Sequence, residues 1–185
     1  MIIMSLSSPP VSACLGPGRA DAVLARLPHH WVAAEELSPA ERRLLDHRAT
    51  MTSTLEAAFG DRLKVQPVAS HVTAGKFARQ AYLALEKSGR LVCATWLFVD
   101  RQAMSPRAFA AITEGREPFG RVMVREGRAL ATAPHAYFRL GGREGASTFL
   151  TSPFPEGAAG RVNRVIEGQG DESLAETIEI LLALP

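Results

Sequence analysis

The sequence has few of the residues and spacings that mark disulfide, metal or covalent chemistry. Its 185 residues include two cysteines, Cys14 and Cys93, which are too few for a disulfide framework or a cysteine-rich metal cluster. The five histidines are scattered, with no pair at the spacing of a zinc-binding helix. No serine lies in a Gly-x-Ser-x-Gly turn. We therefore predict no metal site, and so few cysteines favour a reducing, cytoplasmic setting.

Long apolar runs and a strong excess of one charge are also absent. No run approaches the roughly 20 apolar residues that span a bilayer, so we expect no membrane span. The net charge is +2 and no basic stripe carries interleaved aromatic residues, so we expect no nucleic-acid partner. A hydrophobic fraction of 46% and a charged fraction of 22% are typical of a globular protein with a substantial core.

The chain shows no internal repeat and no shift in composition that would divide it. Residues 1–18 hold three prolines and lack a basic segment, so we interpret them as a flexible tail and not a signal peptide. Residues 19–185 are then expected to form a single domain.

Helix signals dominate the first part of this domain. Residues 20–27 have the composition of a short helix. Ser38 and Glu41 stand as the N-cap and the reciprocal partner of a capping box, which predicts a helix from the proline between them. The hydroxyl residues of RATMTST (48–54) predict a break and then a second helix that ends at Gly60.

From residue 62 onward, short segments rich in β-branched and aromatic residues alternate with turns. A further helix is predicted over 101–115. The end of the chain, residues 173–185, is ambiguous, because its composition favours a helix while residues 177–184 could form a buried strand. The fold class is α+β, with helices leading and a mostly antiparallel sheet following. The predicted strands are 63–70, 77–86, 91–99, 120–127, 135–142 and 147–152.

One charged residue stands in an apolar row of the second of these strands. Simple alternation places Arg79 on one face with Phe77, Ala81, Leu83 and Leu85. An arginine on a core-facing row is either an edge residue with a buried stem or a cation held for an anion. The residues alone leave both interpretations open.

Four segments in a fixed order carry a further signal. They are 44–60 with its Thr-Met-Thr break, 77–99 with Arg79, 115–124 with Pro-Phe-Gly-Arg, and 160–185 with one glutamate in its last strand. Together they resemble the chorismate pyruvate-lyase family and its chorismate-lyase-like relatives. The resemblance covers roughly residues 37–185, and the Pro-x-Gly-Arg element is its most specific part.

The resemblance implies one antiparallel sheet of about six strands, helices packed on it, an internal ligand cavity and a strand at the C-terminal end. It also implies conversion of chorismate to pyruvate and a hydroxybenzoate, foremost 4-hydroxybenzoate as used in ubiquinone biosynthesis, with no metal or organic cofactor. The expected partners are chorismate and the aromatic product, on a monomer or weak dimer. Because elimination makes the ring aromatic, positioning and electrostatic preorganisation can supply most of the acceleration.

The resemblance assigns four site residues. Arg79 matches the arginine that binds the ring carboxylate with a planar fork. Glu179 matches the glutamate that bonds the ring hydroxyl, and these two are the expected catalytic residues. Met51 and Phe119 match substrate-binding positions that offer backbone N–H groups, and Phe119 replaces a leucine and adds an apolar wall.

Alternatives remain for these assignments. Glu172 and Glu176 lie near Glu179 and could take its role. Residues 134–160 match the family poorly, so they leave the identity of the substrate open. Three arginines are candidates for the second carboxylate of chorismate or for a solvated surface, namely Arg121, Arg161 and Arg164.

Two other classes of function also remain. Effector domains of transcription regulators share this fold, so the chain could be a non-catalytic binding module for an aromatic or carboxylate ligand. A structural protein with a vestigial pocket is the third reading. The presence of both Arg79 and Glu179 disfavours it, because a pocket without function has no reason to keep two desolvated ions.

Overall fold

The computed structural model describes residues 19–73, 75–141, 154–168 and 173–185. Seven strands in this part of the chain form one sheet in the order β1-β5-β6-β7-β4-β3-β2, and every neighbouring pair is antiparallel. The predicted α+β class with a single antiparallel sheet is confirmed. The strands are β1 His29–Val32, β2 Leu63–Val72, β3 Lys76–Leu85, β4 Leu91–Asp100, β5 Leu130–Leu140, β6 Ala159–Glu167 and β7 Ser173–Leu181.

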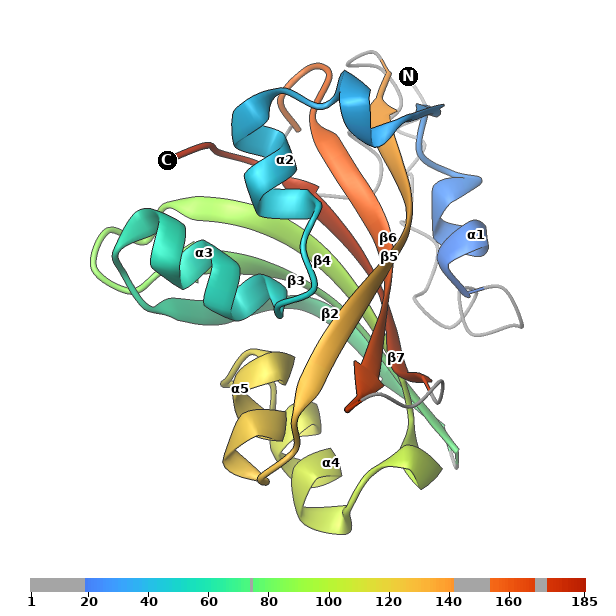
Figure 1. Cartoon of the computed structure of the whole chain (residues 1–185). Coiled ribbons are helices and arrows are strands. Elements are labelled where there is room, and N and C mark those ends of the chain that lie inside the picture. Colours follow the sequence, from blue (N-terminus) through green and yellow to red (C-terminus); the bar gives the residue numbers. More distant parts are fainter. Residues whose placement is uncertain (1–18, 74, 142–153, 169–172) are drawn as a thin grey trace, which may run out of the picture.

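The helices cover the two faces of the sheet unequally. Helices α2, α3, α4 and α5 lie on one face and α1 lies on the other (Figure 1). Short 3-10 turns occupy Ala34–Glu36 and Arg101–Ala103. The helices are α1 Arg19–Leu24, α2 Pro39–Leu45, α3 Met51–Phe59, α4 Pro106–Glu114 and α5 Phe119–Arg125.

Local chemistry sets the helix ends where the sequence predicted them. The Ser38 side chain accepts from the Glu41 N–H at 3.3 Å, and Glu41 Oε2 accepts from the Ser38 N–H at 2.8 Å. Arg139 of β5 also binds Glu41, and this hydrogen bond is the main reason why the pKa of Glu41 falls to about 2. Helix α3 ends at Gly60, whose φ of 63° is a left-handed conformation that suits glycine.

The sequence-based assignment of residues 120–127 was wrong, because this segment lies in α5 and the turn after it. Val122 and Met123 are both fully buried, whereas Val124 is 62% exposed. Two adjacent buried residues followed by an exposed one fit a helix and contradict strand alternation. The short apolar run has no period of its own, so packing against α4 and the sheet decided its conformation.

The other predicted helices and strands differ from the observed ones mainly in where they begin and end. The C-terminal segment is a strand, β7, as the resemblance implied. The sheet has seven strands where about six were expected, and the short edge strand β1 had no sequence signal. The predicted strand at 147–152 and the tail at 1–18 lie outside the described residues.

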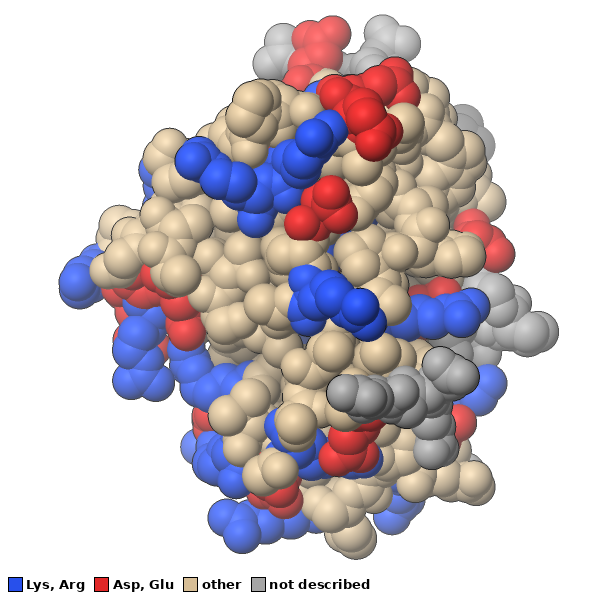
Figure 2. Space-filling view, in the orientation of Figure 1, with Lys and Arg blue, Asp and Glu red and all other residues tan. Residues whose placement is uncertain are grey.

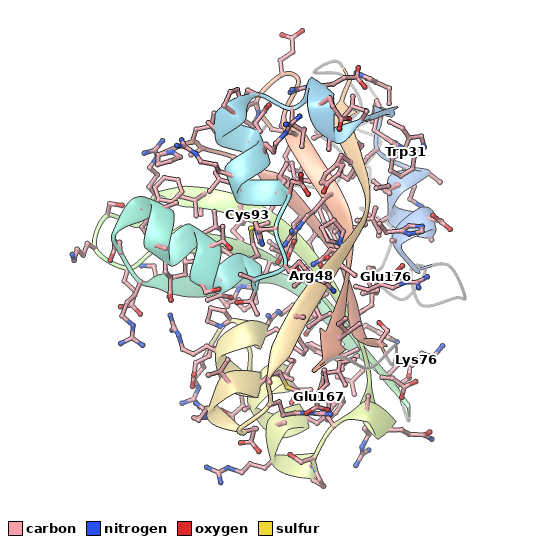
Figure 3. The ribbon with its side chains drawn as sticks, viewed as in Figure 1. Trp31, Arg48, Lys76, Cys93, Glu167 and Glu176 are labelled. Carbon is pink, nitrogen blue, oxygen red and sulfur yellow. The ribbon has the colours of Figure 1, made fainter. Side chains whose placement is uncertain are left out.

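The sheet separates an apolar cluster on its α1 face from two apolar clusters on its helix-covered face, and β3 contributes to all three. Its odd-numbered residues face α2 to α5, while Ala78 and Tyr82 face α1. Cys93, on the neighbouring β4, lies beneath α2 and α3 (Figure 3). Arg79 shares the helix-covered face, and β3 lies between β2 and β4. The edge-strand interpretation of Arg79 is therefore wrong.

Candidate functional site

The register of the sheet aligns the polar residues of its helix-covered face in two neighbouring rows. Each row crosses four strands in the order β3, β4, β7 and β6. Since residues two apart on a strand share a face, both rows point toward the helices. The rows are Arg79–Leu97–Thr177–Asn163 and Ala81–Thr95–Glu179–Arg161.

A cavity of about 50 Å³ lies over these rows. Its wall includes Met51, Arg79, Phe119 and Glu179, so the structure brings together all four residues that the resemblance assigned. Their roles toward a ligand remain predictions. The other lining residues are Thr50, Thr52, Leu83, Thr95, Leu97, Pro118, Gly120, Thr132, Val165 and Thr177.

Arg79 is a buried cation whose charge no carboxylate compensates among the described residues. Its side chain is only 4% exposed. Nη1 donates to the carbonyl of Ile112 at 3.3 Å, near the C-terminal end of α4, and Nε has no partner within the described part of the chain. Burial lowers the pKa of Arg79 to about 10. A guanidinium in this state is stabilised by any anion that enters the cavity.

Glu179 lies among apolar residues, where an unpaired carboxylate would be costly, and it has a cationic partner. Arg161 lies directly opposite it on β6, and its Nε donates to Glu179 Oε2 at 2.6 Å. Arg161 is fully buried. Sequence reasoning named Arg161 as a candidate for the second carboxylate of chorismate or for a solvated surface, and did not pair it with Glu179. The available signal was spacing, because Arg161 and Glu179 stand at equal distances along the sequence from Gly170.

Arg161 also binds the connector between α2 and α3. Its Nη1 donates to the Leu45 carbonyl at 2.6 Å. Thr132 of β5 holds the same connector, because its side chain donates to the carbonyls of His47 and Ala49. Figure 3 shows Arg48, in the middle of this connector, over the centre of the sheet. The connector leads directly into the cavity wall, so Arg161 links Glu179 to that wall.

The N-terminus of α3 opens onto the cavity. Thr50 caps the helix by accepting from the Ser53 N–H at 3.3 Å. Met51 and Thr52 occupy the first two helical positions, whose N–H groups have no acceptor within a helix. Both residues line the cavity. The positive end of the helix and the Arg79 guanidinium therefore face the same space.

Phe119 begins α5 and forms an apolar part of the wall. The next residue, Gly120, lies against the side chain of Thr50, and a Cβ at position 120 would come within 3.2 Å of the Thr50 Cβ. This close approach packs α5 against the start of α3. Glycine at this position therefore sets the distance between the two helices that close the cavity.

The alternative charged residues do not reach this cavity. Arg121 pairs with Glu56 at the surface. Arg164 is exposed on the α1 face, and Glu176 on that same face accepts from the Ala20 N–H. Glu176 therefore cannot take the place of Glu179. Glu172 lies outside the described residues.

A larger hollow of about 720 Å³ lies on the α1 face of the sheet. Figure 3 shows Trp31 and Glu176 on this side of the molecule. Its charged wall residues are mainly acidic, because Asp21, Asp100 and Glu176 share the wall with a single arginine, Arg164. An acidic wall disfavours a carboxylate ligand, in contrast to the cavity around Arg79.

The face seen in Figure 2 does not present a dominant charge. On the face seen in Figure 2, Lys and Arg alternate with Asp and Glu. The described residues contain no cluster of three or more His, Cys, Asp or Glu side chains that could hold a metal ion. None of the helices in the described ranges is long and apolar enough to cross a membrane.

Comparison with solved protein structures finds a distant likeness. No protein-family model matches the chain, and no curated protein matches it. The structure described as "Crystal Structure of PhnF from Mycobacterium smegmatis" overlaps with a TM-score of 0.47 and 12% sequence identity, over 73% of this chain and 64% of that one. The chain thus spans less than two thirds of the length of that protein. Likeness at this level says nothing about a ligand or an activity, and a functional assignment depends on the cavity itself.

Proposed function

We propose that the cavity binds chorismate and that the protein converts it to pyruvate and a hydroxybenzoate, foremost 4-hydroxybenzoate. The observation that carries this proposal is the buried Arg79 guanidinium, which has no carboxylate partner among the described residues and faces the cavity. Such a group favours an anionic ligand, and a planar guanidinium matches the two oxygens of a carboxylate.

One end of the cavity is suited to the ring carboxylate. Arg79 supplies a planar fork, and the N–H groups of Met51 and Thr52 supply further donors at the positive end of α3. The three groups come from two elements, β3 and α3, and face one space. Together they neutralise the charge of the carboxylate and fix the plane of the ring.

The other end is suited to a neutral hydroxyl group. Glu179 accepts a hydrogen bond from the ring hydroxyl, while the ion pair with Arg161 holds Glu179 in place. Because Arg161 already neutralises Glu179, this end attracts a polar group and not a second strong charge. A ring with a carboxylate at one end and a hydroxyl at the other therefore matches the cavity.

The elimination requires only that the ring be positioned by its carboxylate contact with Arg79 and its hydroxyl contact with Glu179. The C3–O bond of chorismate breaks, and the proton on C4 passes to the methylene carbon of the departing enolpyruvyl group. That group becomes pyruvate, the ring becomes aromatic, and atoms and charge balance without a further reactant. Glu179, bonded to the hydroxyl on C4, orients the C4–H bond and stabilises the developing phenol.

Ligand entry requires the wall to move. The cavity of about 50 Å³ is smaller than the roughly 150 Å³ that accommodates a benzene ring. Phe119 and Met51 stand on helices and not on the sheet, so their side chains are the ones we expect to turn aside. Closure of the apolar wall around the ring would then exclude water from the reacting atoms.

A non-catalytic binding module is the second candidate, and one observation favours it. Arg79, Arg161 and Glu179 together leave one positive charge at the cavity. One positive charge matches a monocarboxylate such as 4-hydroxybenzoate better than the two carboxylates of chorismate. Binding of the product without turnover of the substrate would distinguish this candidate.

The first prediction is lyase activity in the absence of added metal. Purified protein incubated with chorismate and a chelator should release pyruvate and a hydroxybenzoate in equal amounts, because the elimination needs no further reactant. Chromatography measures both products. A folded protein that binds 4-hydroxybenzoate but leaves chorismate intact would identify the binding module, and a strict requirement for a divalent metal would contradict the proposed mechanism.

The second prediction concerns Glu179. Glu179→Gln should keep the affinity for 4-hydroxybenzoate within about tenfold, or roughly 1.4 kcal/mol, because shape and hydrogen bonding remain. Turnover should fall further, because the charge acts mainly as the barrier is crossed. Glu179→Ala should lose both. Single-turnover kinetics beside equilibrium binding measures the two effects.

The matched control is Glu176→Gln, on the same strand but on the α1 face. It should leave both binding and turnover at the parent level. Turnover of Glu179→Gln at the rate of the parent would mean that the carboxylate has no catalytic role.

A further inference from the structure

Unpartnered polar groups gather beside Glu179 on β6 and β7. Thr177 Oγ1, both polar atoms of the Asn163 side chain, and Arg161 Nη2 are buried without a hydrogen-bond partner in the described part of the chain. Thr177 is 6% exposed, and Asn163 and Arg161 are fully buried. Buried polar groups without partners are rare in folded proteins and call for an explanation.

The sheet register places these groups at one end of the cavity. Thr177 and Glu179 are two residues apart on β7, so their side chains leave the same face about 7 Å apart. Asn163 is directly opposite Thr177 on β6, where paired side chains lie about 5 Å apart. Thr177 is part of the cavity wall. A ligand oxygen next to Glu179 is therefore within reach of the Thr177 hydroxyl.

Two other hydroxyl groups of the cavity wall behave differently. Thr95 Oγ1 donates to the carbonyl of Ala81 at 3.4 Å, and Thr132 Oγ1 donates to the connector between α2 and α3. Their hydroxyl groups serve the fold. Thr177 has the same chemistry without a partner in the described ranges, so its hydroxyl is available to a ligand in the cavity, and the equally unpartnered Asn163 amide stands opposite it on β6.

We propose that Thr177 and Asn163 form a subsite for a second oxygen substituent on the ligand ring, adjacent to the oxygen that faces Glu179. The inference rests on the proposed function of this cavity and narrows its ligand class to ring carboxylates with two neighbouring oxygen functions. A hydroxyl and an amide both donate and accept, so they suit a neutral hydroxyl or ether oxygen.

The subsite has a defined role in the elimination. The carbon next to the hydroxyl-bearing C4 of chorismate carries the ether oxygen of the enolpyruvyl group, and the bond from C3 to this oxygen is the one that breaks. As the bond lengthens, negative charge develops on the oxygen before it becomes the carbonyl of pyruvate. A hydrogen bond from Thr177, supported by Asn163, stabilises that charge in a site closed to water.

Calorimetric titration with two probes tests the subsite, namely 4-hydroxybenzoate and 3,4-dihydroxybenzoate. The parent should bind the dihydroxy probe about tenfold more tightly, as for one hydrogen bond made by otherwise unpaired buried groups. Thr177→Val should reduce this ratio to about one, and Thr177→Ser should restore it. Thr95→Val, which removes a hydroxyl already bonded to the backbone, should leave the ratio unchanged.

Thermal unfolding of the ligand-free variants separates this role from a structural one. Thr177→Val and Asn163→Leu should be at least as stable as the parent, because each replaces an unpartnered polar group by an apolar group of similar shape. A loss of stability in both variants would show that these groups serve the fold and would overturn the proposal.

The outcomes also distinguish the subsite from the proposed function. If the parent binds 4-hydroxybenzoate and converts chorismate but shows no preference for the dihydroxy probe, the subsite alone is overturned. If the parent binds neither probe and leaves chorismate intact, the proposed function fails and the subsite fails with it. A preference that persists in Thr177→Val assigns the second oxygen to other residues.

Discussion

Replacing Arg79 by methionine should abolish binding of 4-hydroxybenzoate and at the same time stabilise the ligand-free protein. The guanidinium is buried at 4% exposure without a carboxylate partner among the described residues. Its pKa of about 10, against 12.5 for an unperturbed arginine, corresponds to a burial cost of about 3 kcal/mol. Methionine of similar length removes this cost, and it also removes the charge that attracts the ligand.

The loss of affinity should be about 2–5 kcal/mol, the range for truncating one partner of a buried charged pair. Arg79→Lys should also bind poorly, because an ammonium group cannot reproduce the planar fork. Calorimetric titration and urea unfolding measure the two opposite effects. Arg164→Met, a change of an exposed arginine on the other face, is the matched control. Unchanged affinity in both Arg79 variants would mean that the anion binds elsewhere.

Replacing Arg161 by methionine should have the opposite effect on stability. The substitution leaves Glu179 buried without its cation and frees the carbonyl of Leu45. Breaking a buried ion pair in this way costs about 3–5 kcal/mol of the free energy of unfolding. Urea unfolding at neutral pH measures the loss. The contrast with Arg79→Met is the central test, since both variants remove a buried arginine, one that lines the cavity and one that pairs with Glu179 of its wall.

A double variant separates the ion pair from the packing of Arg161. Arg161→Met combined with Glu179→Leu removes both charges, so a large part of the lost stability should return. The fraction that does not return measures the contacts of Arg161 with the connector between α2 and α3. Equal destabilisation in the single and the double variants would show that the charge of Glu179 plays no part.

Local sequence signals predicted the elements whose ends depend on neighbouring residues. The capping box at Ser38 and the left-handed stop at Gly60 appear as predicted, because their hydrogen bonds and backbone angles lie within a few residues of each other. The segment at 120–127 was assigned wrongly. Its short apolar run fits the period of a helix as well as that of a strand, and burial against α4 and the sheet made it helical.

The sequence by itself determined that Arg79 stands on a core-facing row, because strand alternation fixes the face of each side chain within one strand. Its pattern also placed Met51 at the start of a helix and Phe119 after the proline of a Pro-x-Gly-Arg element, whereas only the family resemblance placed Glu179 in a strand. Only the tertiary structure decided which charges meet. Arg161 pairs with Glu179 because the register of β6 on β7 places them opposite each other, and Arg79 has no carboxylate partner among the described residues. Ion pairing depends on distances between strands, and those distances exist only once the sheet has formed.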